Sequence, residues 1–259
     1  MRLRFLGTGT SFGIPVIGCT CAACTSADPR DRRTRHGALL QDDEARTNIL
    51  IDTPPELRLQ LLAAQVSRVD AVWFTHAHAD HTHGIDDLRI FSHDASARLP
   101  AYADSACARF MRQKFDYIFD QDYQPIGGPK VNLELIEFTA HQPVRIGSLT
   151  LLPLPFPHGD VQSFGFRVGD LGYITDAKSI PPPARAALQG VKVLVLNALW
   201  FGKPHATHMT IEEAVETARE LGAERTYLTH LTHRVVHQQA VAALPPEVQP
   251  AYDGLVLEI

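Results

Sequence analysis

Residues 75–81 read THAHADH and place three histidines and one aspartate within a single short stretch. They follow the apolar run AVWF at residues 71–74, which is typical of a short buried strand. Imidazole nitrogens and carboxylate oxygens are ligands that suit zinc, manganese and iron. Side chains two positions apart on an extended segment leave it on the same side, as His76 and His78 would. The stretch predicts a metal site at a strand end, with Asp80 and His81 available for a second ion. A solvated turn explains any one of these residues but not all of them together.

The overall composition limits what kind of protein this is. A chain of 259 residues with 45% hydrophobic content can bury a full core, so we expect one domain over residues 1–259 with two layers of sheet. The net charge of −5 disfavours non-specific nucleic-acid binding and favours a small or specifically docked substrate. No apolar run approaches the ~20 residues that cross a bilayer, and no signal peptide is visible, which predicts a cytoplasmic protein without a membrane partner.

Three of the four cysteines lie close together, at Cys19, Cys21 and Cys24. This spacing favours metal binding over a disulfide framework, because three thiolates can converge on one tetrahedral ion when a fourth ligand arrives from elsewhere. His233, three residues beyond His230, is the candidate for that ligand. The alternative is a set of small buried thiols without a metal. We therefore expect a zinc-binding loop at about residues 18–36, and Cys107 as an ordinary core residue.

Further candidate ligands follow other expected strands. A hairpin is expected at residues 164–168 and 171–175, turning at Gly169 and Asp170, and it ends at Asp176. Strands at 149–152 and 226–229 lead to His158 and His230, and a buried strand at 191–196 ends at Asn197. Because side chains at strand ends can meet in one cleft between sheets, the repetition favours a shared metal centre.

The remaining segments predict helices and connecting loops. Residues 210–221 begin with a capping box and end at Gly222. Residues 52–55 are expected to start a helix, and residues 105–119 to form one that packs on the core or covers the pocket mouth. The glycine-rich stretch 7–13 predicts a turn, or alternatively a contact for an anion. The arginines of residues 30–35 predict a solvated loop, with phosphate contact as the alternative, and His83 and His205 are spare imidazoles.

The order H-x-H-x-D-H after a strand resembles the metallo-β-lactamase superfamily. This resemblance implies an α/β (α+β) fold, namely a four-layer αβ/βα sandwich of two mixed sheets with helices outside. It also implies two divalent ions at the active site, with Asp176 bridging them and Asp80 and Asp176 taking part in catalysis. The implied ligands are His76, His78 and His158 for one ion, and Asp80, His81 and His230 for the other.

The Cys-x-Cys-x-x-Cys segment, the late His-x-x-His and the HMT sequence at 208–210 resemble the PhnP-like phosphodiesterase branch of that superfamily. By this resemblance His208 is the general acid, the active-site ions are zinc or manganese, and a structural zinc is held by Cys19, Cys21, Cys24 and His233. The implied reaction is hydrolysis of a small or cyclic phosphodiester by a metal-bridging hydroxide.

Other functions remain open on the same fold. These are an RNA-processing nuclease, a thioester hydrolase and a non-catalytic metal-binding sensor. The absence of a long basic or Gly/Pro-rich arm counts against processing of tRNA. The expected partner is a small phosphodiester, and a homodimer is compatible with the sequence.

Overall fold

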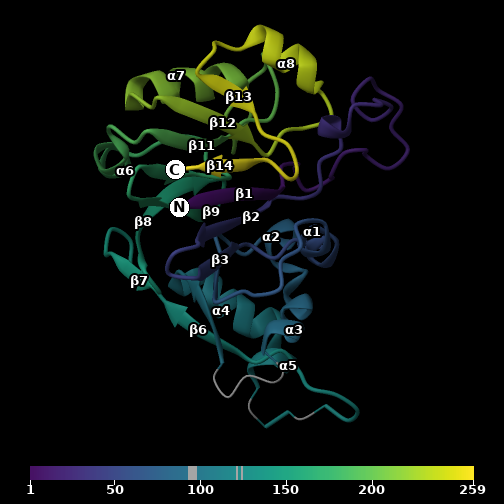
Figure 1. The fold of residues 1–259 in the computed structure, drawn as a ribbon, viewed down its shortest axis with the longest axis vertical. Helices are drawn as coiled ribbons and strands as arrows, with labels where there is room; N and C mark the ends of the chain where they lie inside the picture. The colour runs from purple at the N-terminus through teal and green to yellow at the C-terminus, as the bar shows by residue number, and fades with distance from the viewer. Residues whose placement is uncertain (93–97, 121, 124) are drawn as a thin grey trace.

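Two mixed sheets form the centre of the molecule (Figure 1). The computed structural model describes residues 1–92, 98–120, 122–123 and 125–259. Within these residues the first sheet has seven strands in the order β14-β1-β2-β3-β4-β5-β6. Their bounds are β1 Arg2–Gly7, β2 Gly37–Asp42, β3 Thr47–Ile51, β4 Ala71–Trp73, β5 Leu99–Ala103, β6 Leu133–Glu137 and β14 Val256–Glu258.

The second sheet repeats this arrangement with the C-terminal half of the chain. Its seven described strands have the order β13-β12-β11-β10-β9-β8-β7, and β10 to β13 run parallel to one another. Their bounds are β7 Val144–Ile146, β8 Leu149–His158, β9 Val161–Val168, β10 Leu171–Tyr173, β11 Val193–Asn197, β12 Arg225–Thr229 and β13 Val248–Pro250.

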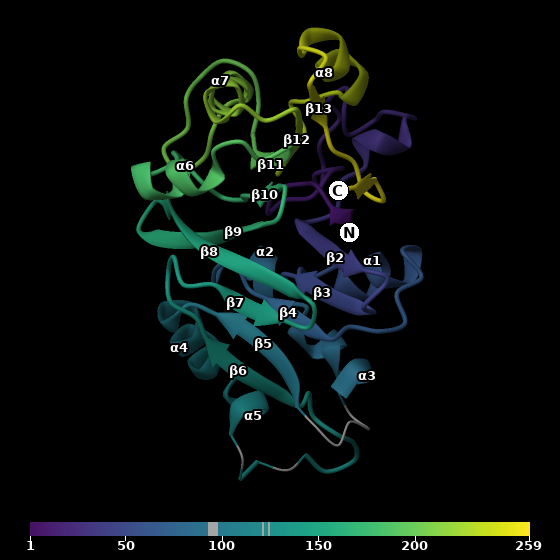
Figure 2. The same cartoon turned by 60° about the vertical axis from the view of Figure 1, so that its left-hand side comes forward.

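Helices cover the outer face of each sheet, as Figures 1 and 2 show. Side chains of α1, α4 and α5 share an apolar cluster with the first sheet, and those of α6, α7 and α8 share one with the second. A third cluster, which includes Phe5, Trp73 and Phe166, lies between the sheets. The predicted four-layer αβ/βα sandwich is therefore confirmed. The helices are α1 Leu57–Ala63, α2 Ala79–Thr82, α3 Arg89–Ser92, α4 Ser105–Lys114, α5 Asp116–Phe119, α6 Pro182–Leu188, α7 Ile211–Leu221 and α8 His237–Ala243, with 3₁₀ turns at Pro29–Asp31 and Ile85–Leu88.

Local sequence signals determine several of these elements. The Thr210 hydroxyl accepts the amide hydrogen of Glu213, the Glu213 carboxylate accepts that of Thr210, and Gly222 ends α7 in the left-handed conformation. The hairpin of β9 and β10 turns at residues 169–170 as expected. The single helix expected at 105–119 is wrong in one respect: it breaks at Phe115, whose φ of −117° and ψ of 45° separate α4 from α5. The helix expected to start at residues 52–55 begins at Leu57.

Of two loop predictions, one holds and one is wrong. The backbone amides of Thr8 and Gly9 in the glycine-rich stretch donate to Asp253 and Thr34, so these groups are occupied within the protein, and the turn interpretation holds for them. Arg33 is fully buried, donates to the carbonyl oxygen of Val235 and contacts Asp31, which contradicts a wholly solvated arginine loop. None of the helices in the described ranges is long and apolar enough to span a membrane.

Candidate metal centre

The predicted ligands lie where strands of both sheets end. β8 ends at His158, Asp176 follows β10, and His230 directly follows β12, while His76 follows β4 of the other sheet. Each of these four side chains exposes no more than 4% of its surface. Residues separated by up to 154 positions in the sequence therefore meet in one buried cluster between the sheets.

One group of three nitrogens comes from His76, His78 and His158, whose ligand atoms all lie within 4.8 Å of one another. Nε2 of His76 is 3.0 Å from Nδ1 of His78, and Nε2 of His158 is 3.3 Å from that same atom. Desolvation lowers the pKa of all three imidazoles. They are therefore neutral near pH 7 and carry the lone pairs that a metal ion needs.

A second group contains Asp80, His81 and His230, again with ligand atoms within 4.8 Å of one another. Asp176 lies between the two groups. Its Oδ2 is 3.2 Å from Nε2 of His81, and its Oδ1 is 3.1 Å from Nε2 of His230 and 4.0 Å from Nε2 of His158. This position is the one that a carboxylate shared by two ions requires.

The donor atoms fit divalent metal ions. Nε2 of His81 and both ring nitrogens of His230 are buried and have no hydrogen-bond partner within the described part of the chain. An unpaired buried polar atom costs about 1–3 kcal/mol, which a bound cation would remove. Burial alone would raise the pKa of Asp176, but His230 and His81 hold it well below its usual range, so the carboxylate is charged. Neutral imidazoles with charged carboxylates are a ligand set for zinc or manganese.

His208 also reaches this cluster, from the loop before α7. Its Nε2 lies 2.8 Å from Oδ1 of Asp176, and its Nδ1 lies 2.8 Å from the hydroxyl oxygen of Thr207. The carbonyl oxygen of Thr207 lies 3.2 Å from Nδ1 of His158, so the same loop also holds a metal-ligand candidate. Burial lowers the pKa of His208, and the hydrogen bond to Asp176 opposes that shift.

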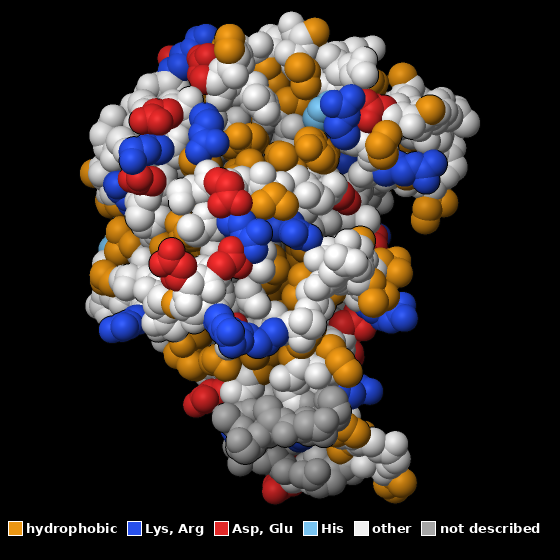
Figure 3. Space-filling model, viewed as in Figure 1, with side chains coloured by type: hydrophobic (Ala, Val, Ile, Leu, Met, Phe, Trp, Pro, Cys, Tyr) orange, Lys and Arg blue, Asp and Glu red, His pale blue; other side chains and the backbone are white. Residues whose placement is uncertain are grey.

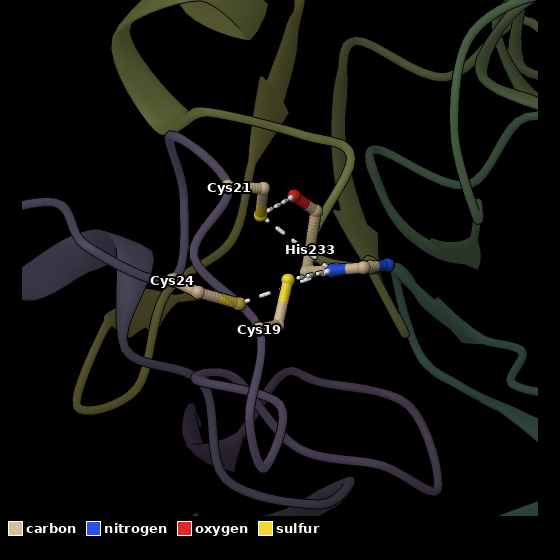
Figure 4. Close-up of side chains that lie close together, drawn as sticks. All are labelled: Cys19, Cys21, Cys24 and His233. Carbon is tan, nitrogen blue, oxygen red and sulfur yellow. Dashed lines mark hydrogen bonds between the residues drawn. The ribbon is translucent and has the colours of Figure 1, made fainter.

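The three clustered cysteines meet His233 at a separate site (Figure 4). Nδ1 of His233 is 3.2 Å from Sγ of Cys19, 3.5 Å from Sγ of Cys21 and 3.8 Å from Sγ of Cys24. All four cysteines of the chain have free thiols, and Cys107 is buried in α4. Three sulfur atoms and one nitrogen around a common point suit a tetrahedral zinc ion.

The spare imidazoles lie at different distances from the cluster. His83 donates from Nδ1 to the carbonyl oxygen of Ala79 at 2.9 Å, and its ring packs on Phe115. His205 is nearer, because its ring centroid lies 5.3 Å from that of His208. His83 is therefore outside the ligand groups, and His205 borders the loop that carries His208.

Comparison with known proteins agrees with this geometry. The family model for the beta-lactamase superfamily domain matches residues 47–231, a range that holds both ligand groups. The chain belongs to the metallo-β-lactamase superfamily. A solved structure described as a new diphosphatase from the PhnP family is 38% identical, with 100% of this chain and 97% of that chain covered and a TM-score of 0.90. The predicted PhnP-like branch is therefore confirmed.

Two curated relatives carry other names. An octanoyltransferase from Porphyromonas gingivalis is 37% identical over 98% of this chain, and a ribonuclease Z from Bradyrhizobium is 31% identical over 64% of it. The matches cover 51% and 53% of those proteins, so this chain spans about half the length of both.

Asp52 is a residue of the candidate metal centre that the sequence did not reveal. It is fully buried behind the second ligand group, and its Oδ2 lies 2.6 Å from Nδ1 of His81. Its carboxylate also accepts the backbone amide and the hydroxyl of Thr75, each at 2.8 Å. A carboxylate that binds one imidazole nitrogen leaves the other nitrogen, here Nε2, as the metal ligand.

His36 is a second residue that was missed. It is fully buried beneath the centre, with Nε2 2.6 Å from the Tyr173 hydroxyl and Nδ1 3.2 Å from the Thr229 hydroxyl. Its ring centroid lies 5.6 Å from that of His81. Nothing near residue 36 in the sequence marks it as part of the site, because its partners come from β10 and β12.

Proposed function

We propose that the protein is a di-metal phosphodiesterase that hydrolyses a small or cyclic phosphodiester. The observation that carries this proposal is the Asp176 carboxylate, which lies between two groups of three ligands while His208 contacts the same carboxylate at 2.8 Å. Two adjacent cation sites beside a protonatable side chain match the needs of phosphoryl transfer, where negative charge gathers on several oxygens at once.

The metal ions, zinc or manganese, would lower the pKa of a bound water and offset charge on the phosphoryl oxygens. The chain's own residues orient and retain these ions. Asp52 fixes the tautomer of His81, and the carbonyl oxygen of Thr207 does the same for His158, because each accepts the Nδ1 hydrogen and leaves Nε2 free. Both ligands are thus held with Nε2 toward the cluster. Burial alone would lower the pKa of His81, but Asp176 and Asp52 raise it well above its usual range, so a bound cation would take the place of the Nε2 proton.

His208 is the general acid of this proposal. A leaving alkoxide needs a proton, and the Nε2 edge of His208 faces the ligand cluster while Thr207 holds the opposite edge. Burial lowers its pKa in the free protein. A phosphodiester anion bound beside the ring would raise that pKa again, so protonation of His208 is coupled to substrate binding.

A small substrate fits better than a long nucleic acid. On the face shown in Figure 3, acidic and basic side chains are interspersed, which gives no continuous basic track there. The similar diphosphatase also supports cleavage at a phosphorus atom. Its name extends the proposed substrates to diphosphates, which carry the same charged phosphoryl groups.

Turnover of bis(p-nitrophenyl) phosphate with added Mn²⁺ tests the proposal, with an octanoyl thioester as the comparison substrate. We expect metal-dependent release of p-nitrophenol and slow thioester cleavage. Asp176→Asn should abolish the reaction, whereas His83→Gln, a change outside the ligand groups, should retain it. Efficient cleavage of the thioester without diester cleavage would instead identify an acyl hydrolase.

A further inference from the structure

Lys178 lies where three segments of the candidate metal centre meet. It follows Asp176 by two positions in the segment after β10. Its backbone amide donates to the carbonyl oxygen of Pro157 at 2.9 Å, and Pro157 immediately precedes the ligand candidate His158. Its Nζ donates to the backbone carbonyl oxygen of His208 at 3.4 Å. One residue therefore contacts the segments on both sides of Asp176.

The side chain of Lys178 forms an ion pair with the first turn of α7. Nζ lies 2.7 Å from Oε1 and 2.9 Å from Oε2 of Glu213. Burial alone would raise the pKa of Glu213, but the hydrogen bond from Lys178 lowers it, so the carboxylate is charged. The same carboxylate accepts the backbone amide of Thr210 at 2.8 Å within the capping box. Lys178 is thereby linked to the helix that follows the segment carrying His208.

Residues 198–210, which we call the acid loop because they carry the proposed general acid His208, form neither helix nor strand. Residues 201–204 within this loop are exposed. The Glu212 carboxylate accepts the amide of Gly202, with its two oxygens at 3.0 and 3.1 Å, and Lys178 contacts the loop again at the His208 carbonyl oxygen. The start of α7 and the Lys178 ammonium thus hold the acid loop at two points.

The hydrogen bonds of Lys178 favour a role in positioning over direct binding of substrate. An ammonium group has three hydrogens, and the structure gives Lys178 three oxygen partners. Two are the carboxylate oxygens of Glu213, and the third is the carbonyl oxygen of His208. All three hydrogens are thus engaged within the protein, and a phosphoryl oxygen would have to displace one of these partners.

Stability of the fold gives little reason for a lysine at this position. The side chains of Lys178 and Glu213 are 30% and 38% exposed, and ion pairs at such surfaces contribute little to stability. The ammonium also lies at the N-terminal end of α7, where the helix dipole disfavours a cation. This combination favours a role for the pair in placing the acid loop.

We propose that Lys178 is a positioning residue for the general acid: its ammonium joins the acid loop to the segment that carries Asp176 and so sets the distance between the His208 ring and the scissile phosphodiester. This inference rests on the proposed phosphodiesterase function and on His208 as its acid. A misplacement of about 1 Å can cost roughly 10²-fold in rate, so a contact remote from the reacting atoms can have a large effect.

The kinetic test uses Lys178→Met, which keeps the stem of the side chain but removes the ammonium. On the metal-loaded enzyme, kcat for adenosine 2′,3′-cyclic phosphate, whose leaving group is a sugar hydroxyl, should fall about ten-fold or more while KM stays within about two-fold. For bis(p-nitrophenyl) phosphate, whose leaving group departs without a proton, kcat should fall less than about three-fold. Lys178→Arg, which keeps the charge and the donors, should restore most of the rate on the cyclic diester. A raised KM with unchanged kcat on both substrates would show that Lys178 binds substrate and would overturn the positioning role.

Lys192→Met is the matched control. Lys192 also pairs with a carboxylate, with Nζ 2.6 Å from Oδ2 of Asp170, but it precedes β11 and so lies at the opposite end of the second sheet from the ligand candidates. Its variant should keep the wild-type kcat on both substrates.

A double variant tests whether Lys178 acts through His208. In the His208→Ala background, Lys178→Met should cause no further loss on the cyclic diester, because the group that it positions is already gone. An equal loss from Lys178→Met in both backgrounds would show that the lysine acts independently of His208, and the proposal would be overturned.

A third measurement does not depend on turnover. In ¹⁵N-histidine-labelled protein loaded with Zn²⁺, the ring signal of His208 is identified by its loss in His208→Ala. Lys178→Met should broaden or split this signal, because the acid loop then samples more than one position, whereas Lys192→Met should leave it unchanged. An unaltered His208 signal in Lys178→Met would overturn the positioning role. If the wild type cleaves no diester, the proposed function fails, and this signal still decides whether Lys178 positions the His208 ring.

Discussion

Replacing Asp52 by asparagine should weaken one of the two active-site metal sites selectively. The Asp52 carboxylate accepts three hydrogen bonds, at 2.6 Å from Nδ1 of His81 and at 2.8 Å from the amide and the hydroxyl of Thr75. Asparagine keeps the shape and one oxygen but turns the other acceptor into an NH₂ donor. An NH₂ group facing His81 favours the tautomer with hydrogen on Nε2, and that hydrogen occupies the position of the metal.

The expected loss of metal affinity follows from the lost orientation of one ligand, His81. Changes to groups that orient a metal-binding histidine typically cost 10–100-fold in metal affinity, or about 1.4–2.7 kcal/mol. The loss should fall mainly on the Asp80, His81 and His230 group, because Asp52 contacts His81 directly. It reaches the other group indirectly, through the Thr75 hydroxyl, which lies 3.0 Å from Nδ1 of His76. Titration with Mn²⁺, followed through the signal of the free ion, should then show one site near wild-type affinity and one weakened site.

Asp70→Asn is the matched control for this experiment. Asp70 also accepts a backbone amide, that of Asn48 at 2.7 Å, and contacts Arg68, but it precedes β4 and so lies at the opposite end of that strand from the histidines. Its variant should bind two Mn²⁺ ions like the wild type. If Asp52→Asn also binds both ions within about three-fold of the wild type, the tautomer argument is wrong.

Three further outcomes are expected. His208→Ala should retain its metals but lose about 10²–10⁴-fold in diesterase rate, with the largest loss for poor leaving groups. His83→Ala is the control and should keep a rate close to that of the wild type. An unchanged rate of the His208 variant on a cyclic nucleotide would show that His208 takes no part in the reaction. Cys21→Ser should lower the zinc content by one ion and the Tm by roughly 3 °C or more, unlike Cys107→Ser, and unchanged zinc would contradict the structural site. In zinc-stripped protein, a backbone hydrogen bond from Cys24 lowers the pKa of Cys21 to about 6 whereas burial raises that of Cys24 to about 11. Iodoacetamide at pH 7 should therefore alkylate Cys21 first, with a rate that falls as the pH drops below about 6.

The sequence was sufficient to predict local structure and site chemistry wherever the interacting residues lie close together in the chain. The THAHADH stretch and the capping box of α7 are complete within a few residues, so their chemistry could be predicted directly. The convergence of His158, Asp176 and His230 was predictable from a weaker signal, namely a polar residue at the end of each apolar run. The structure brings these residues together as expected.

The features that could not be predicted depend on contacts between residues that are far apart in the sequence. Asp52 is 29 residues from His81, and its own neighbours Pro54 and Pro55 indicate only the start of a helix. The break at Phe115 has no local glycine or proline to mark it. Its buried ring packs in the cluster beneath the first sheet, and α5 then begins at Asp116 without a side-chain cap. Tertiary packing thus overrides a helical pattern that continues in the sequence.

Three of the six described non-glycine residues with positive φ lie at the same edge as the ligands. Asp52, Asp176 and His230 each follow a strand and have φ values of 61°, 50° and 59°, in the left-handed region that residues with a Cβ rarely adopt. Such conformations cost about 1–3 kcal/mol each, and here they turn three side chains toward one point as their strands end. Asparagine tolerates this region better than alanine does, so it removes the charge of Asp52 without adding backbone strain. An alanine or glycine variant would mix both effects, which is why Asp52→Asn isolates the hydrogen bond to His81.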